Sequence, residues 1–176
     1  FTAHQIKPIS NYPKELFKSL ASCAENRTSE PNVAVLTPGI YNSAYYEHSF
    51  LADEMGVELV QGSDLHVHDE RVMIRTTTGT QNVDVIYRRV EDDFLDPLSF
   101  NPTTLLGTPG LFDAYRSGAV ILANAPGTGI ADDKAIYSYI PEIIKFYTGE
   151  RALLNNIPTW RCSEIDDLRY VLELSL

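Results

Sequence analysis

The heptapeptide VAVLTPG at residues 33–39 decides the fold class of this 176-residue chain. Its first four residues are apolar without interruption, which is typical of a strand buried in a parallel sheet, and the Pro-Gly pair ends that strand. Residues 46–55 then show helical periodicity and stop at Gly56, and a second predicted strand follows at residues 57–60. The stretch therefore predicts a strand-helix-strand unit.

Further strands are expected downstream. Residues 64–67 and 72–76 form a predicted hairpin, and residues 83–87 follow it as another buried strand. The apolar run AVILA at residues 119–123 is the next one. This alternation predicts an α/β domain with a Rossmann-like, mostly parallel sheet flanked by helices, with a β-hairpin insertion.

Several segments outside the sheet have helical patterns. Residues 13–20 follow a proline suited to a first turn, and residues 132–147 carry an apolar stripe that is expected to bend or restart at Pro141. The segment from residue 163 begins with a capping-box-like pattern. Residues 93–110 contain three prolines and two glycines and are expected to form a long loop, a type of segment that often carries function.

The length of the chain predicts one domain. Within it we assign residues 1–30 to an edge helix and linker and residues 31–160 to the Rossmann-like core. Residues 161–176 are assigned to the start of a connection to a missing part of the protein. Because the first residue is Phe1 and not methionine, we expect the chain to be excised from a longer protein.

Charge and composition exclude several classes of partner. The chain has 24 acidic and 14 basic residues and a formal charge of -10, which disfavours binding to nucleic acid or to anionic membrane surfaces. No apolar run approaches the roughly 20 residues needed to span a bilayer. Cys23 and Cys162 lie far apart without metal-type spacing, so neither a disulfide framework nor a zinc site is predicted and a cytoplasmic location is expected.

Three loops follow predicted strands, at residues 37–48, 88–97 and 124–134. They are expected to meet at the carboxyl edge of the sheet, where ligands bind in folds of this class. Arg88 and Arg89 stand directly after a strand, and a guanidinium held there can grip a carboxylate or phosphate. An equally open interpretation is a surface ion-pair cluster, because acidic residues follow at once.

The third loop, NAPGTGIADDK at residues 124–134, has glycines that let backbone amides approach an anion. It matches neither the Walker A spacing nor the GxGxxG fingerprint. The alternative is an ordinary strand-to-helix turn with an aspartate cap, in which Lys134 is a solvated residue and not a phosphate-facing cation. The spacing of His66 and His68 on a predicted strand favours surface decoration over a metal site, and no metal is predicted.

Three segments together, at residues 36–48, 83–97 and 124–139, resemble the circularly permuted ATP-grasp type 2 family (also called DUF407), which includes glutathionylspermidine-synthase-like proteins. The resemblance continues through MGVELV at residues 55–60 and LNNIPT at residues 154–159, so it covers nearly the whole chain.

The resemblance implies an ATP-dependent carboxylate-amine ligase that forms an acyl phosphate and makes a small peptide or peptide conjugate, with Mg²⁺ neutralising the phosphates. It also implies that this chain is a pre-ATP-grasp-like central part of a longer protein, with the main ATP- and metal-binding elements beyond Leu176. ATP and Mg²⁺ are therefore expected to act in the full-length protein and not to bind tightly to this chain, which is expected to be inactive alone. The expected partners are small carboxylate and amine substrates and the remaining domains of the same protein.

By the same resemblance, candidate roles fall on three groups of residues. The substrate-side loop contains Asn42, Ser43, Glu47 and His48. The residues that grip a carboxylate or the acyl phosphate are Arg88 and Arg89. The edge of the nucleotide site contains Asn124, Gly127, Gly129, Asp133 and Lys134.

Two other functions stay open. One is a non-catalytic binding or scaffold module that keeps the fold without the chemistry. The other is a free-standing Rossmann-like nucleotide binder, which would bind ATP or a dinucleotide by itself. The unusual glycine spacing of residues 124–134 argues against the nucleotide binder.

Overall fold

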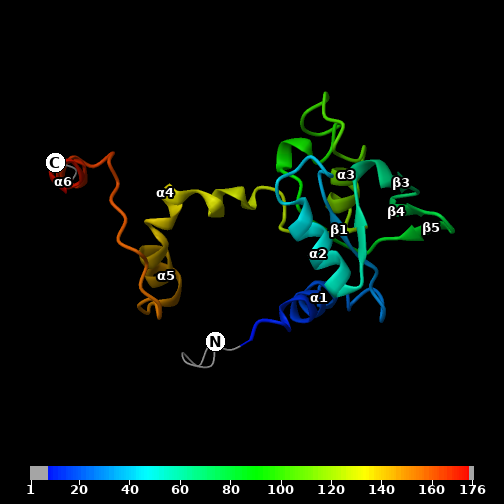
Figure 1. The fold of residues 1–176 in the computed structure, drawn as a ribbon, viewed down its shortest axis with the longest axis horizontal. Coiled ribbons are helices and arrows are strands. Elements are labelled where there is room, and N and C mark those ends of the chain that lie inside the picture. Colours follow the sequence, from blue (N-terminus) through cyan, green and yellow to red (C-terminus); the bar gives the residue numbers. More distant parts are fainter. Residues whose placement is uncertain (1–7, 175–176) are drawn as a thin grey trace. The chain divides into compact units, whose positions relative to one another are not determined.

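A computed structural model of the chain describes residues 8–174, and Figure 1 shows its elements. The chain divides into two compact units, with the boundary after Pro126. This boundary lies inside the range 31–160 that the sequence assigned to one core. That the chain forms a single domain within a longer protein stays a prediction.

The first unit contains a four-stranded parallel sheet in the order β2-β1-β6-β7. Its strands are β1 (Val33–Leu36), β2 (Glu58–Val60), β6 (Val85–Arg88) and β7 (Ile121–Ala123). In the register of the sheet, Ala34 lies beside Ile86, which in turn lies beside Leu122. The expected parallel α/β sheet flanked by helices is confirmed, whereas a specifically Rossmann-like topology stays a prediction.

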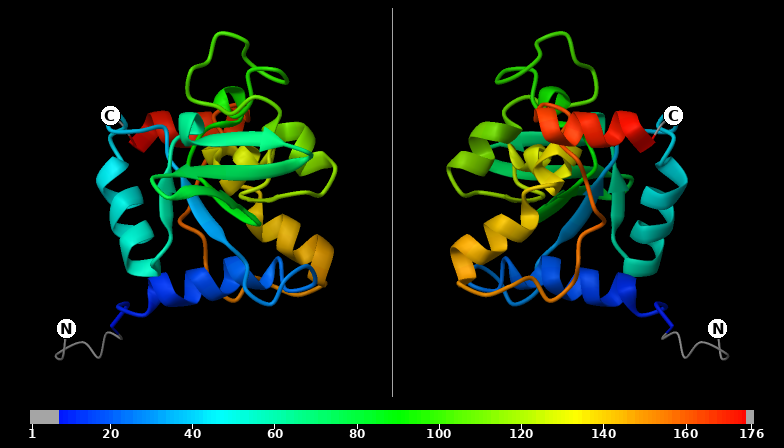
Figure 2. Two further views of the ribbon diagram at one scale, coloured as in Figure 1. Left: turned by 90° about the vertical axis from the view of Figure 1, so that its right-hand side faces the viewer. Right: turned by 90° about the vertical axis from the view of Figure 1, so that its left-hand side faces the viewer.

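A second, antiparallel sheet is inserted between β2 and β6. It contains β3 (Leu65–His68), β4 (Arg71–Thr76) and β5 (Gly79–Asn82), and its strands face the viewer in the left panel of Figure 2. The expected hairpin is present, but the insertion also has a third strand, β5, which was not predicted from the sequence. The sequence GTQN of β5 is polar and mostly exposed, so it lacks the apolar alternation that identifies a strand.

Alternate residues of the central strands enter two cores on opposite faces of the parallel sheet, because side chains along a strand alternate in direction. One core combines residues of α1 (Tyr12–Ser22) and α2 (Tyr45–Met55) with Val33, Val35 and Val85. The other combines residues of the antiparallel sheet and α3 (Leu111–Arg116) with Ala34, Leu36 and Ile86. The parallel sheet is therefore the central layer of the first unit.

Helix α2 ends as its sequence predicts. Gly56 has φ 68°, the left-handed conformation that glycine adopts without a steric penalty, and its N–H caps the last turn by bonding to the carbonyl groups of Ala52 and Asp53. The preceding residue, Met55, is buried in the core beside the helix. This cap directs the chain from α2 into the parallel strand β2.

The long loop at residues 93–110 is packed into the first unit. Thr108 Oγ1 donates to the Gly62 carbonyl at 3.0 Å, and the buried Asp96 carboxylate accepts backbone N–H bonds that include the N–H of Phe112 at 2.9 Å. Gly107 lies so close to the carbonyls of Phe94 and Leu95 that a Cβ would overlap them. The expected loop is therefore present, but its backbone is fixed by close contacts.

The second unit is helical. It contains η4 (Thr128–Asp132), α4 (Lys134–Tyr137), α5 (Ile140–Thr148) and α6 (Ile165–Leu174). The expected restart of the helix is confirmed, since α5 begins at Ile140 with Pro141 as its second residue. Within residues 127–174, no residue is buried. The assignment of residues 31–160 to one Rossmann-like core stays a prediction.

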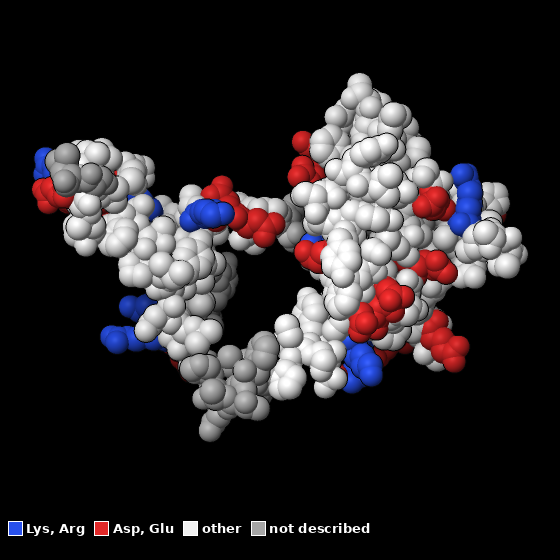
Figure 3. Space-filling view, in the orientation of Figure 1, with Lys and Arg blue, Asp and Glu red and all other residues white. Residues whose placement is uncertain are grey.

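The surface of the first unit carries acidic side chains at several places on the face drawn in Figure 3, in keeping with the net charge of -10. Cys23 and Cys162 are both free and exposed. None of the helices within residues 8–174 combines the length and the apolar character needed to cross a bilayer.

Candidate functional site

The candidate site lies at the carboxyl edge of the parallel sheet, where β1, β6 and β7 end beside one another. The Arg89 side chain reaches Glu47 from the first loop, and the Arg88 side chain reaches Asn124 from the third. These two contacts connect residues 42 and 36 positions apart. Within the first unit, the loops that the sequence placed at this edge are therefore brought together.

Arg88 is buried at the end of β6, with 8% of its side chain exposed. Its Nε donates to the Asn124 carbonyl at 2.9 Å, and its Nη2 donates to the Ala125 carbonyl at 3.3 Å. Its Nη1 donates to the Val90 carbonyl at 2.7 Å and lies 2.6 Å from Asp92 Oδ1. The guanidinium thus joins the loop after β6 to the segment after β7, and most of its donors are used within the protein.

Arg89 is more accessible, with 27% of its side chain exposed. Its backbone N–H bonds to the Leu36 carbonyl at 2.8 Å, which extends the ladder between β1 and β6. Its Nη2 donates to Glu47 Oε1 at 2.7 Å and its Nη1 to the Tyr87 hydroxyl at 3.3 Å, while its guanidinium carbon lies 5.8 Å from the centre of the Tyr87 ring. A half-buried guanidinium at this edge can exchange one carboxylate partner for another.

His48, in the first turns of α2, is 2% exposed. Its Nδ1 lies 2.9 Å from Thr37 Oγ1, at the end of β1, and the Gly39 N–H donates to the same hydroxyl at 3.3 Å. Burial lowers the pKa of His48, the nearby positive charge of Arg89 lowers it further, and Glu47 acts in the opposite direction. His48 is therefore held neutral and joins α2 to the end of β1.

Asn42 and Ser43 are exposed in the loop before α2. Asn42 Oδ1 accepts a hydrogen bond from the Ala44 N–H at 2.9 Å, an arrangement that turns the chain into the helix. Their role in binding a substrate stays a prediction, as do the roles expected for Glu47 and His48.

The residues expected at a nucleotide edge are divided between the two units. Asn124 directly follows β7 and has φ 60°, whereas Gly127, Gly129, Asp133 and Lys134 belong to the second unit. Asp133 accepts a bond from the Ala135 N–H at 2.7 Å and so caps α4, as the alternative interpretation of this loop expects. A phosphate-binding role for this loop stays a prediction.

Two residues that the structure buries, Thr37 and Asp96, had no specific role predicted from the sequence. Thr37 is 1% exposed and is the hydrogen-bond partner of His48. Asp96 is fully buried and holds the loop at residues 93–110. The Asp-Pro pair at residues 96–97 was a local signal for a turn, but the partners of Asp96 lie up to sixteen residues away.

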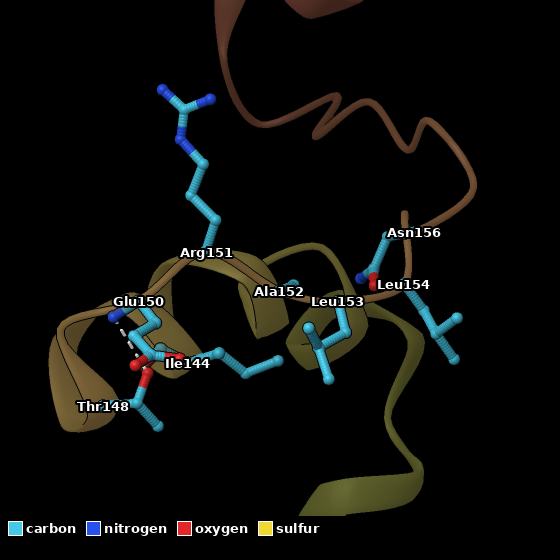
Figure 4. Close-up of a pocket in the computed structure, with 8 residues that line it drawn as sticks. All are labelled: Ile144, Thr148, Glu150, Arg151, Ala152, Leu153, Leu154 and Asn156. Atoms are coloured by element: carbon cyan, nitrogen blue, oxygen red, sulfur yellow. Dashed lines mark hydrogen bonds between the residues drawn. The ribbon is translucent and has the colours of Figure 1, made fainter.

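A separate hollow lies within the second unit. Its volume is about 410 Å³, and Figure 4 shows the residues that line it, with Arg151 pointing away from the others. These residues are Ile144, Thr148, Glu150, Arg151, Ala152, Leu153, Leu154 and Asn156. None of them is a site residue expected from the sequence. Among residues 8–174, there is also no cluster of three or more histidine, cysteine or acidic side chains that could hold a metal ion.

The fold and this edge define an α/β protein with a charged candidate site at the carboxyl ends of parallel strands. A model of a family described as a circularly permuted ATPgrasp matches residues 1–175. The chain therefore belongs to the circularly permuted ATP-grasp family, and the resemblance found in the sequence is confirmed at this level. The finer type 2 and glutathionylspermidine-synthase-like assignment stays a prediction.

Similar proteins occur in several bacteria. An uncharacterized protein of Synechocystis sp. strain PCC 6803 is 55% identical over 173 residues, which cover 98% of this chain and 36% of that protein. An uncharacterized protein of Mycobacterium tuberculosis strain H37Rv is 47% identical over 173 residues, 98% of this chain and 31% of its own length. The chain thus spans about a third of the length of these two relatives.

A third relative carries the name of an enzyme. The Frankia alni protein named "Putative glutamate--cysteine ligase 2-3" is 45% identical over 166 residues, which cover 93% of this chain and 19% of that protein. Together with the family match, this name supports a ligase-type family.

Proposed function

We propose that this chain is the substrate-binding part of an ATP-dependent carboxylate-amine ligase. The complete reaction would convert a carboxylate, an amine and ATP into an amide, ADP and phosphate through an acyl phosphate, and its product would be a small peptide or peptide conjugate. The observation that carries the proposal is the accessible Arg89 guanidinium at the carboxyl edge of a parallel sheet, in a chain of the circularly permuted ATP-grasp family.

In this reaction, the role that we propose for the chain is to bind the carboxylate substrate. A guanidinium recognises a carboxylate through two parallel hydrogen bonds, and Arg89 has donors beyond those given to Glu47 and Tyr87. Arg88 serves as a positioning residue, since its hydrogen bonds hold β6 and the segment after β7 in register. The neutral His48 holds the start of α2, and with it Glu47, at the edge.

We assign ATP and Mg²⁺ to the complete protein. ATP, when bound there, would supply the phosphoryl group that activates the carboxylate. Mg²⁺ prefers several oxygen ligands, and no cluster of acidic side chains among residues 8–174 fits it. Of the residues expected at the nucleotide edge, Asp133 already caps α4. We also propose the remaining domains of the complete protein as partners of this chain.

The test is to measure ADP release and amide formation by the complete protein. L-glutamate with L-cysteine is the first substrate pair, because those are the substrates in the name of the Frankia alni relative, and other amino acids follow. We expect amide and ADP in equal amounts, and an Arg89→Gln variant to lower kcat/KM by roughly a hundredfold through loss of a charged contact.

A non-catalytic binding or scaffold module is the alternative outcome of the same experiment. If no pair of amino acid substrates causes ADP release above the background without substrate, the ligase proposal fails. Calorimetric titration of Mg·ATP into the complete protein and into this chain gives an independent check. Tight binding by the chain alone would contradict the assignment of the nucleotide to the rest of the protein.

A further inference from the structure

Arg89 and Glu47 form an ion pair in which each side chain can still make further hydrogen bonds. Their contact is a single bond, from Arg89 Nη2 to Glu47 Oε1 at 2.7 Å, whereas a guanidinium and a carboxylate can form two parallel bonds. Glu47 has 56% of its side chain exposed, and Arg89 has 27%. The pair is therefore reachable from solvent and can open without breaking a second bond between its members.

The surroundings of the pair keep the positions of its two charges well defined. The Arg89 backbone is hydrogen-bonded to β1, and its side chain also contacts the Tyr87 hydroxyl and ring. Glu47 lies in the first turn of α2, whose entry is held by the buried contact between His48 and Thr37. One positive and one negative group are thus presented side by side on supported elements, unlike a pair between two mobile surface side chains.

A ligand that separates this pair must satisfy both charges. A phosphate or a simple carboxylate would pair with Arg89 but would leave Glu47 beside a second negative charge. An α-amino acid carries a carboxylate and an ammonium group on one carbon atom, so it can bind both residues at once. Glu47 lies in the first turn of α2, and its carboxylate oxygens can accept hydrogen bonds from an ammonium group.

We propose that the Arg89–Glu47 pair is the closed form of a binding site for the zwitterionic α-carbon of an amino acid. The ligand carboxylate binds Arg89 and the ligand ammonium group binds Glu47, in place of the direct bond between the two side chains. This inference rests on the proposed ligase function and names the substrate class that its edge site takes.

The experiment measures binding to the complete protein without ATP, by calorimetry, with three matched probes: glycine, acetate and methylammonium. Acetate is glycine without its ammonium group, and methylammonium is glycine without its carboxylate. The variants are Glu47→Gln and Arg89→Gln. The matched control is Glu15→Gln, which breaks the exposed Glu15–Lys18 pair of 2.8 Å on α1.

We expect glycine to bind at least about tenfold more tightly than either single-charge probe. Each site variant should weaken glycine binding by about tenfold or more, because each removes one of its two charge partners. For acetate the two variants should have opposite effects: Glu47→Gln tightens binding by removing the competitor for Arg89, and Arg89→Gln abolishes it. The control Glu15→Gln should stay within about twofold of the parent.

The proposal is overturned if glycine binds no better than acetate, or if Glu47→Gln leaves glycine affinity within twofold of the parent. Near-UV circular dichroism of each variant checks that it is folded, and Glu47→Gln carries the test if Arg89→Gln is not. Because no ATP is present, the result is separate from the ligase assay. Glycine binding without ADP release would contradict the ligase function alone, and ADP release without the expected binding pattern would contradict this site alone.

Discussion

The two units of the chain contain similarly apolar sequence, but only the first of them buries it. In the first unit, Ile86 of the parallel sheet is fully buried in the core that this sheet shares with the antiparallel insertion. In the second unit, Phe146 on the amphipathic helix α5 is 81% exposed, and nothing within residues 127–174 is buried. An apolar stripe therefore predicts which face of a helix can pack against other residues, but it does not predict whether residues of the same chain cover that face.

This difference has a consequence for stability. Buried apolar area is the main favourable contribution to folding, at about 25 cal/mol per Å² removed from water. The first unit has two such cores, one on each face of its parallel sheet. The second unit depends on hydrogen bonds and half-buried contacts, such as the bond from the Ile157 N–H to the Tyr137 hydroxyl at 2.9 Å. We therefore expect it to open more readily.

The largest effect should come from the core of the first unit. Ile86→Ala removes a fully buried side chain and should lower the free energy of unfolding by about 2–5 kcal/mol, measured by urea denaturation. The control Ile130→Ala changes an exposed isoleucine of the second unit and should cost less than about 0.5 kcal/mol. Equal effects of the two substitutions would remove the contrast between the units.

The next largest loss of stability is expected from replacing Arg88, the buried arginine at the site. Arg88→Met keeps an unbranched apolar side chain but leaves the carbonyls of Asn124, Ala125 and Val90 without their donor. We expect a loss of about 2–3 kcal/mol in the free energy of unfolding. The matched variant Arg169→Met alters an exposed arginine of α6 and should be nearly neutral. A neutral Arg88→Met would mean that Arg88 does not hold these segments together.

A smaller effect is expected in how the free energy of unfolding depends on pH. The pKa of His48 is lowered in the folded state by burial and by Arg89, so the unfolded chain takes up the proton more readily. Its contribution to stability is complete above the ordinary histidine pKa of about 6.5 and declines as pH falls below that value toward the folded-state pKa. A His48→Gln variant should lose this part of the pH dependence in urea titrations, while His68→Gln, which changes an exposed histidine, should keep it.

The smallest effect is expected in the second unit. Phe146→Ala removes a side chain that is 81% exposed and should change the free energy of unfolding by less than about 0.5 kcal/mol. Native-state hydrogen exchange measures the two units separately, and amides of α5 should exchange faster than those of β1 and β6. Equal protection of α5 and of these strands, or a loss above 2 kcal/mol in Phe146→Ala, would show that the apolar face of α5 is covered in solution.

Much of the fold could be predicted from the sequence because the signals are local. The apolar runs before Pro38 and Asn124 predict β1 and β7, Gly56 predicts the end of α2, and Pro141 predicts the start of α5. Strand β5 was missed because its polar sequence forms a strand only by pairing with β4. Local propensity is a weak guide wherever pairing decides the conformation.

At the site, the strand pattern alone predicts which charged residues lie at the carboxyl ends of strands, and it does not distinguish Arg88 from Arg89. Only the tertiary structure separated them: Arg88 is occupied by carbonyl groups 36 and 37 residues away, and Arg89 meets Glu47 across 42 residues. The same holds for the two units, since the stripe on α5 is visible in the sequence but its exposure is not. Periodicity along a chain encodes local conformation, whereas hydrogen-bond partners and burial depend on what packs against each residue from distant parts of the chain.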